Sequence, residues 1–240
     1  MGENVYLIFE ESYQDYGHHL KSPVQFFTEN HDACREMDHL LLSNLKDALS
    51  YSSLVEFHKK SLFHIIEKLY HSSDEESGKY NYVLGDEKLV VTFTCNCIEI
   101  FLYKEMGSDY MHRIQLKRIY KHIIDTKPYM LLCAGVNDRE FAAFDILFFS
   151  SFYEASSFMH CHYHDNLDLL KKELVSSRKM IEDIEKEIDQ TILQGQEVIS
   201  SYNIEDKLLM CFMDETQCYM DLSKNNENCI YTMEIMQLPH

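Results

Sequence analysis

The stretch YNYVLGDEKLVVTFTCNCIEIFLYK (80–104) contains three short runs rich in β-branched and aromatic residues. Residues of these types are favoured in strands, and Gly85-Asp86 between the first two runs is typical of a hairpin turn. The stretch therefore predicts three successive strands at 80–84, 88–94 and 98–104. Their antiparallel pairing decides the β part of the fold.

The chain before this stretch predicts a hairpin and two helices. NVYLIFEE (4–11) and HLKSPVQFF (19–27) are strand-like runs with turn residues between them, and apolar residues recur at helical spacing over 28–49 and 53–71. The segment SSDEESGK (72–79) is polar and acidic, which is typical of a linker. We expect a domain boundary there, between 1–72 and 80–240, with a single domain as the alternative.

The chain after this stretch predicts further helices and strands. A helix over 109–125 should end before Pro128, and a short strand at 129–134 should precede a helix, or a helix and a strand, over 138–158. Leucine and isoleucine spacing then predicts one long amphipathic helix near 165–202. Strands follow at 207–213, 217–222 and 229–236. The expected class is α+β, with antiparallel strands and several amphipathic helices.

The apolar seam of residues 167–202 allows two arrangements. The seam packs against its own domain, or it pairs with another helix and makes the chain a homodimer.

Charge and composition limit the location and the partners. The formal net charge is −18, and no apolar run reaches the length of a membrane span. The N-terminus lacks a secretory signal, and the eight cysteines lack the spacing of a disulfide scaffold, so we expect a cytoplasmic protein with free thiols. The negative charge favours a basic protein or ribonucleoprotein as partner, and it disfavours nucleic acid and membranes. Acidity for solubility alone is the alternative.

Two acidic clusters are candidate partner-binding sites. Spaced carboxylates can imitate the phosphates of a nucleic acid and occupy a cationic groove. Solvent-exposed helix charge is the alternative reading. The residues are Asp74, Glu75 and Glu76 in the linker, and Glu182, Asp183 and Glu185 on the long helix.

A basic stripe and a histidine cluster suggest two other chemistries. Arg113, Lys117 and Lys121 recur every four residues, with Arg118 beside them, so on a helix they would form a surface for RNA or an acidic partner. A solvated helix face is the alternative. His160, His162 and His164 could hold zinc with Cys95 and Cys97, although we expect no cofactor and a surface histidine cluster.

Known catalytic motifs are absent from the sequence. It contains no Walker loop, dinucleotide fingerprint, nucleophile elbow, H-E-x-x-H zinc motif or deaminase signature. Only seven glycines are present, which disfavours a loop that cradles phosphate. These absences favour a non-enzymatic protein, and an active site without a known motif is the alternative.

The first 45 residues resemble the hairpin-plus-helix modules of uncharacterised phage and bacterial proteins. The resemblance rests on VYLIFEESYQDYG (5–17) and FFTENHDA (26–33), and it implies a phage or bacterial accessory protein without an activity to transfer. Together with the charge, it favours an inhibitor or regulator of a nucleic-acid-handling complex, by analogy with anti-defence and anti-CRISPR-type proteins. The alternative is an RNA-engaging or metal-dependent protein.

Overall fold

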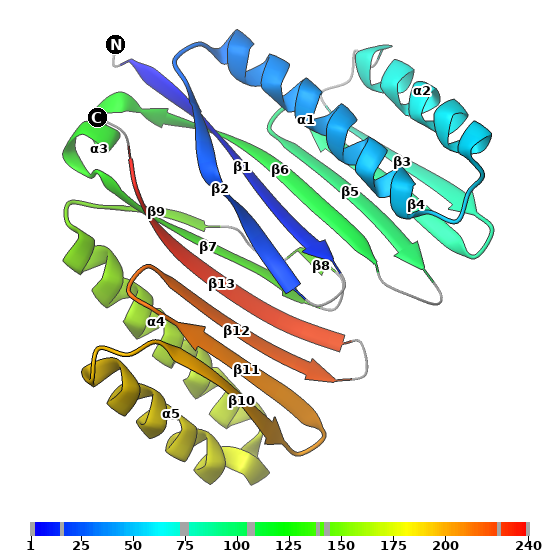
Figure 1. The fold of residues 1–240 in the computed structure, drawn as a ribbon. Coiled ribbons are helices and arrows are strands. Elements are labelled where there is room, and N and C mark those ends of the chain that lie inside the picture. The colour runs from blue at the N-terminus through cyan, green and yellow to red at the C-terminus, as the bar shows by residue number, and fades with distance from the viewer. Residues whose placement is uncertain are drawn as a thin grey trace. The chain divides into compact units, whose positions relative to one another are not determined.

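The computed structural model describes residues 3–14, 17–72, 77–104, 109–137, 140–141, 145–224 and 227–238. It divides into two compact units, Met1–Lys121 and His122–His240. Each unit has one antiparallel sheet with two long helices (Figure 1). The α+β class that the sequence predicts is confirmed.

The first unit consists of a hairpin, two helices and four further strands. Its sheet order is β2-β1-β6-β5-β4-β3, so the last strand returns to the middle and pairs with the first. The hairpin, the two helices and the three strands predicted up to residue 104 are confirmed. The elements are β1 (Asn4–Gln14), β2 (Gly17–Phe27), α1 (Asn30–Tyr51), α2 (Glu56–Ser72), β3 (Ser77–Leu84), β4 (Glu87–Thr94), β5 (Cys97–Lys104) and β6 (Tyr110–Tyr120).

The core of the first unit lies between its helices and one face of its sheet. Alternate residues of a strand point to the same face, so Ile98, Ile100 and Leu102 of β5 all face the helices. Leu41 and Leu45, one turn apart on α1, are fully buried against this face. Burial of these side chains, rather than helix propensity, stabilises the layer, at about 1.5–3 kcal/mol for each large apolar side chain.

The helix predicted over 109–125 is wrong. Residues 110–120 form β6, which pairs with β1 on one side and β5 on the other, and only α3 (Lys121–Thr126) is helical. In this segment, apolar residues recur at intervals of both two and four residues, and basic residues recur at an interval of four. Such spacing fits one face of a strand as well as one face of a helix.

The second unit repeats the element order of the first. Its sheet order is β10-β11-β12-β13-β7-β8, with β9 also pairing with β7, so its last strand again pairs with its first. The predicted strand at 129–134 and the three C-terminal strands are confirmed. The elements after α3 are β7 (Tyr129–Asn137), β8 (Glu140–Phe141), β9 (Asp145–Phe149), α4 (Phe152–Glu173), a 3-10 turn (Val175–Ser177), α5 (Arg178–Leu193), β10 (Val198–Ile204), β11 (Lys207–Met213), β12 (Gln217–Lys224) and β13 (Glu227–Gln237).

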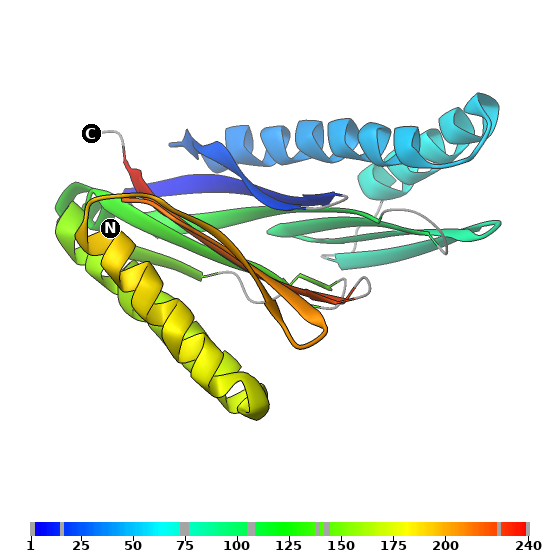
Figure 2. The same cartoon turned by 60° about the horizontal axis from the view of Figure 1, so that its bottom comes forward.

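The single long helix predicted near 165–202 is also wrong. The chain turns back at Leu174, so α4 and α5 lie side by side, as Figure 2 shows, and Val198–Ile204 is a strand. The predicted seam residues are buried in the core of their own unit, including Leu167, Ile181 and Ile188. The seam therefore serves packing within the unit and is not available to a second copy.

The two units share a sequence signature as well as a topology. FFTENHDACREM (26–37) and FFSSFYEASSFM (148–159) each lead from the strand that pairs with the first strand into the first long helix. Both keep Phe-Phe at the strand end, and the helix residues Ala33 and Met37 correspond to Ala155 and Met159, all four of them buried. The two units thus share the pattern of this strand-to-helix junction.

The division between the units differs from the expected boundary at 72–79. Strands on both sides of that segment belong to one sheet, and the chain divides into its two units between Lys121 and His122.

Within the described ranges, none of the helices combines the length and the apolar character needed to cross a membrane.

Candidate functional site: an acidic pocket beside a histidine network

An acidic pocket of about 640 Å³ lies in the second unit. It is formed by the first turns of α4, the C-terminal end of α5 and the turn between β11 and β12. Three carboxylates line it, and none of its lining residues is a lysine or arginine. The lining residues are Phe152, Ser156, His160, Ile192, Gly195, Gln196, Glu197, Met213, Asp214, Glu215 and Thr216.

Two local structures hold the carboxylates at the pocket. Gly195 has a φ of +67°, a conformation that suits glycine at the end of a helix, and Glu197 follows two residues later. Asp214 accepts hydrogen bonds from the backbone N–H groups of Thr216 and Gln217, each at 2.7 Å. Such bonds stabilise a turn, and this turn presents Glu215 to solvent at its tip.

His160 is the titratable base of the pocket. Burial lowers the pKa of His160, and the charge of His164 one helical turn away lowers it further, whereas Asp189 acts in the opposite direction. His160 is therefore neutral near pH 7. The pocket then contains three carboxylates and no cation.

His164 joins α4 to α5. Its Nδ1 atom lies 3.0 Å from Glu185 Oε1, and its Nε2 atom lies 3.2 Å from Asp189 Oδ1. The contact with Glu185 is a hydrogen bond, and both contacts are ion pairs when both ring nitrogens carry a proton, which is the imidazolium form. In that form, His164 bridges two carboxylates that are one turn apart on α5.

Lys171 extends this network toward the C-terminal end of α4. Its Nζ atom lies 2.6 Å from Glu185 Oε2 and 2.8 Å from Asp168 Oδ1. Burial favours the protonated form of Glu185, but hydrogen bonds from Lys171 and His164 outweigh it and lower the pKa of this carboxyl group. One member of the predicted histidine cluster, His164, and one member of the predicted acidic cluster, Glu185, thus belong to one ion-pair network.

The three candidate histidines lie on α4 but not on one face. His160 and His164 share the face toward α5, whereas His162 packs edge-on against Phe158 with ring centroids 4.7 Å apart. Among the described residues, no three His, Cys, Asp or Glu side chains are grouped so that they could hold a metal ion.

The cysteines expected to complete a zinc site belong to the first unit. Burial is the main cause that raises the pKa of Cys97 to about 11, so its thiol stays protonated at neutral pH. Cys95 is exposed.

The acidic residues predicted on the long helix are paired with cations. Glu182 contacts Arg178 at 3.3 Å, and Asp183 contacts Lys179 at 2.9 Å. Together with Glu185 in the network, they present little unpaired charge. Asp74, Glu75 and Glu76 lie outside the described residues.

The pocket carboxylates Glu197, Asp214 and Glu215 were not among the sequence candidates. Each is isolated in the sequence from the dense acidic clusters, and the fold brings them together from two turns. The available signal was their position beside turn residues at the ends of predicted elements.

The predicted basic stripe does not exist as one surface. On β6, Arg113 and Lys117 lie on one face of the sheet and Arg118 on the other. Arg113 is buried and forms ion pairs with Glu11 and Glu99 on the two neighbouring strands. The remaining member, Lys121 in α3, lies 3.0 Å from Glu3.

Comparisons with known proteins give no relative. No family model, curated protein or solved structure matches the chain. The resemblance of the first 45 residues to phage and bacterial modules therefore stays a prediction.

Proposed function

We propose that this chain is a non-enzymatic interaction protein that binds a basic protein through the acidic pocket of its second unit. The observation that carries the proposal is the pocket lining, which combines three carboxylates with neutral His160 and an apolar wall. A lysine or arginine side chain fits such a site, because its charged end pairs with carboxylates and its methylene groups pack on apolar side chains.

The charge of the whole chain supports the same kind of partner. Residues 122–240 contain 21 acidic and 9 basic side chains, against 19 and 13 in residues 1–121. The excess of negative charge is thus larger in the unit that holds the pocket. A basic partner would be attracted at long range and then oriented by the pocket.

Proteins that handle nucleic acid form the partner class that we propose. They present lysine and arginine in arrays that match phosphates, and a carboxylate pocket can compete for those side chains. The chain would then inhibit or regulate such a complex in the cytoplasm, as anti-defence proteins do.

The test compares two variants with the same change in net charge. Glu197→Lys with Glu215→Lys changes the pocket, and Asp165→Lys with Glu173→Lys changes exposed acids of α4 outside it. Binding of an arginine-rich peptide is measured by fluorescence anisotropy. We expect the pocket variant to lose about tenfold or more in affinity and the control to lose much less.

Equal losses in both variants would show that bulk charge, and not the pocket, attracts the peptide. Purification of the tagged chain from its native cell at low and physiological salt then identifies the natural partner by mass spectrometry. A stoichiometric basic protein that the pocket variant fails to retain supports the proposal. Bound RNA or zinc in the same sample, without such a protein, supports the alternative function.

A further inference from the structure

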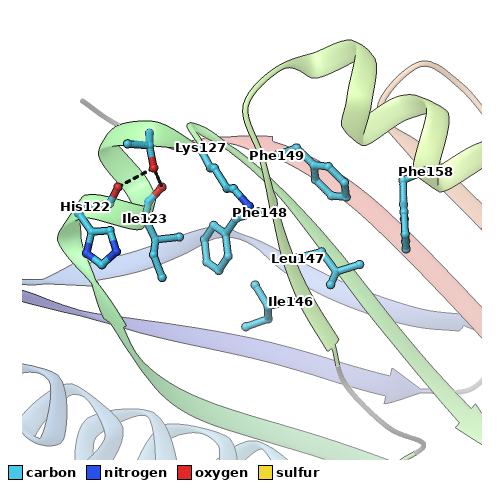
Figure 3. Close-up of a pocket in the computed structure, with 9 residues that line it drawn as sticks. His122, Ile123, Lys127, Ile146, Leu147, Phe148, Phe149 and Phe158 are labelled. Carbon is cyan, nitrogen blue, oxygen red and sulfur yellow. Dashed lines mark hydrogen bonds between the residues drawn. The ribbon is translucent and has the colours of Figure 1, made fainter.

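A second pocket of about 560 Å³ lies elsewhere in the second unit and has a different lining. Its walls come from α3, the edge strand β9 and one residue of α4 (Figure 3). Its size lies in the range of small-molecule sites, which hold about 300–1,000 Å³. The lining residues are His122, Ile123, Thr126, Lys127, Ile146, Leu147, Phe148, Phe149 and Phe158.

Most of this lining is apolar and aromatic. Figure 3 shows Lys127 reaching from the end of α3 toward the Phe148 ring. Figure 3 shows Leu147, Phe149 and Phe158 on the opposite side of β9 from Ile146 and Phe148, and the ring centroids of Phe149 and Phe158 lie 5.4 Å apart. A pocket of this kind accepts a flat or branched apolar body.

Lys127 is the only lysine or arginine among the lining residues of this pocket. No carboxylate of the described residues lies within 4.0 Å of its amine. Glu154 lies near enough to feel its charge, but that carboxylate accepts hydrogen bonds from the hydroxyl and the backbone N–H of Ser150. The hydroxyl group of Thr126, another lining residue, is engaged elsewhere, because it donates a hydrogen bond to the backbone carbonyl of His122 at 2.7 Å. Lys127 therefore retains the capacity to pair with an added anion.

We propose that this pocket binds a small organic anion with an apolar body, such as an aromatic carboxylate. The carboxylate pairs with Lys127 at the rim, and the apolar body lies against Ile123, Ile146 and Phe148. This site is separate from the acidic pocket and does not depend on the proposed function. A chain with a net charge of −18 repels anions in general, so a preference for an anion has to come from a local cation.

The test uses three probes with one body and different heads. These are 1-naphthoate, 1-naphthalenemethanol and 1-naphthalenemethylamine, and isothermal titration calorimetry of the full chain measures their affinities. We expect naphthoate to bind about tenfold more tightly than the alcohol, because it adds a charge-assisted hydrogen bond. The amine should bind more weakly than the alcohol at this site.

Lys127→Met keeps the length of the side chain and removes its charge. We expect this variant to bind naphthoate about tenfold more weakly, at the level of the alcohol, with no change for the alcohol itself. Lys172→Met, at an exposed position of α4 outside the pocket, is the matched control and should bind naphthoate like the wild type.

Methyl NMR of isoleucine-labelled protein locates the probe. Signals of Ile123 and Ile146 should shift on addition of naphthoate, and the signal of Ile192 in the acidic pocket should not. The proposal is overturned if no probe binds, if the amine binds as tightly as naphthoate, or if both lysine variants lose affinity equally. Shifts at Ile192 alone would also overturn it.

Discussion

Asp221 is a buried carboxylate on a central strand. It is 3 % exposed, and its cross-strand neighbours are Met210 on β11 and Ile230 on β13. The Tyr219 hydroxyl donates to Oδ2 at 3.2 Å, and Oδ1 has no hydrogen-bond partner among the described residues. Burial raises the pKa of Asp221 to about 6, against the opposing effect of Tyr219.

This raised pKa gives stability a definite dependence on pH. Between about pH 4 and pH 6 the folded state binds a proton that the unfolded state releases, so stability falls as the pH rises through this window. The rise in the pKa of Asp221 from 3.8 to about 6 lowers the free energy of unfolding by roughly 3 kcal/mol at neutral pH. Above about pH 6 Asp221 is ionised in the folded state as well, so stability does not fall further for this reason.

We therefore predict that Asp221→Asn stabilises the protein at pH 7.5. The neutral amide removes the buried charge, so the free energy of unfolding in urea should rise by roughly 1–2 kcal/mol. The gain should disappear at pH 4, where Asp221 of the folded wild type is protonated. Asp165→Asn, at an exposed site, is the control, and an equal gain there would contradict the explanation.

Corresponding turns of the two units adopt the same backbone conformation with different residues. Gly85 between β3 and β4 has a φ of +73°, and Glu205 at the corresponding turn between β10 and β11 has a φ of +59°. Glycine adopts this conformation without strain, but glutamate does not. The Glu205 carboxylate accepts hydrogen bonds from the hydroxyls of Ser176 and Ser177, and these hold the turn in place.

At the scale of elements, the packing of α4 on α5 combines an apolar seam with a partly buried ion pair. Lys171 is 13 % exposed and its partner Glu185 is 21 % exposed, whereas the Lys179–Asp183 pair on α5 is well exposed. Exposed pairs contribute about 0–1 kcal/mol because water and salt screen them. A half-buried carboxylate that loses its cation costs more.

We predict that Lys171→Met lowers the free energy of unfolding by roughly 1–2 kcal/mol, while Lys179→Met changes it by less than about 0.5 kcal/mol. Urea unfolding at pH 7 measures both. The lowered pKa of Glu185 means that its stabilising contribution is present above the ordinary glutamic acid pKa and is lost as the pH falls through the lowered value. The difference between the variants should shrink in acid, and equal effects at pH 7 would contradict the assigned roles.

Strand β6 shows why some elements escaped prediction. Tyr110, His112 and Ile114 are spaced two residues apart and lie on the face of the sheet that the helices cover. Apolar and basic residues of the same segment also recur at an interval of four residues. Local spacing could not choose between strand and helix. Pairing with β1 and β5 decides it, and both partners are distant in the sequence or separated by a loop.

At the scale of the whole molecule, negative charge opposes folding. With a net charge of −18 the folded chain repels itself, most of all in the second unit. Added salt screens exposed charges and affects partly buried pairs less. We predict that the Tm rises by a few degrees between about 20 and 300 mM NaCl, where screening becomes strong. Differential scanning calorimetry measures it, choline chloride controls for specific sodium binding, and a fall in Tm with both salts would contradict the prediction.

The two units have the same topology but differ at their turns. Both units have the same order of strands in the sheet, a Phe-Phe pair at the strand end, and a buried alanine and methionine in the first long helix. In the second unit, Glu197, Asp214 and Glu215 come from two turns and line one pocket. Packing constrains the residues at core positions, whereas turns at the surface tolerate different residues.

The sequence by itself determined the class, the N-terminal hairpin, the first two helices and most of the strands, because each depends on a local period of two or about 3.6 residues. Only the tertiary structure decided that 110–120 is a strand, that the chain turns at Leu174, and that the units divide at Lys121 and His122. It also decided that His164 meets Glu185 and that Glu197 shares a pocket with Glu215. These outcomes depend on which distant segments share buried surface, and a local pattern does not record that choice.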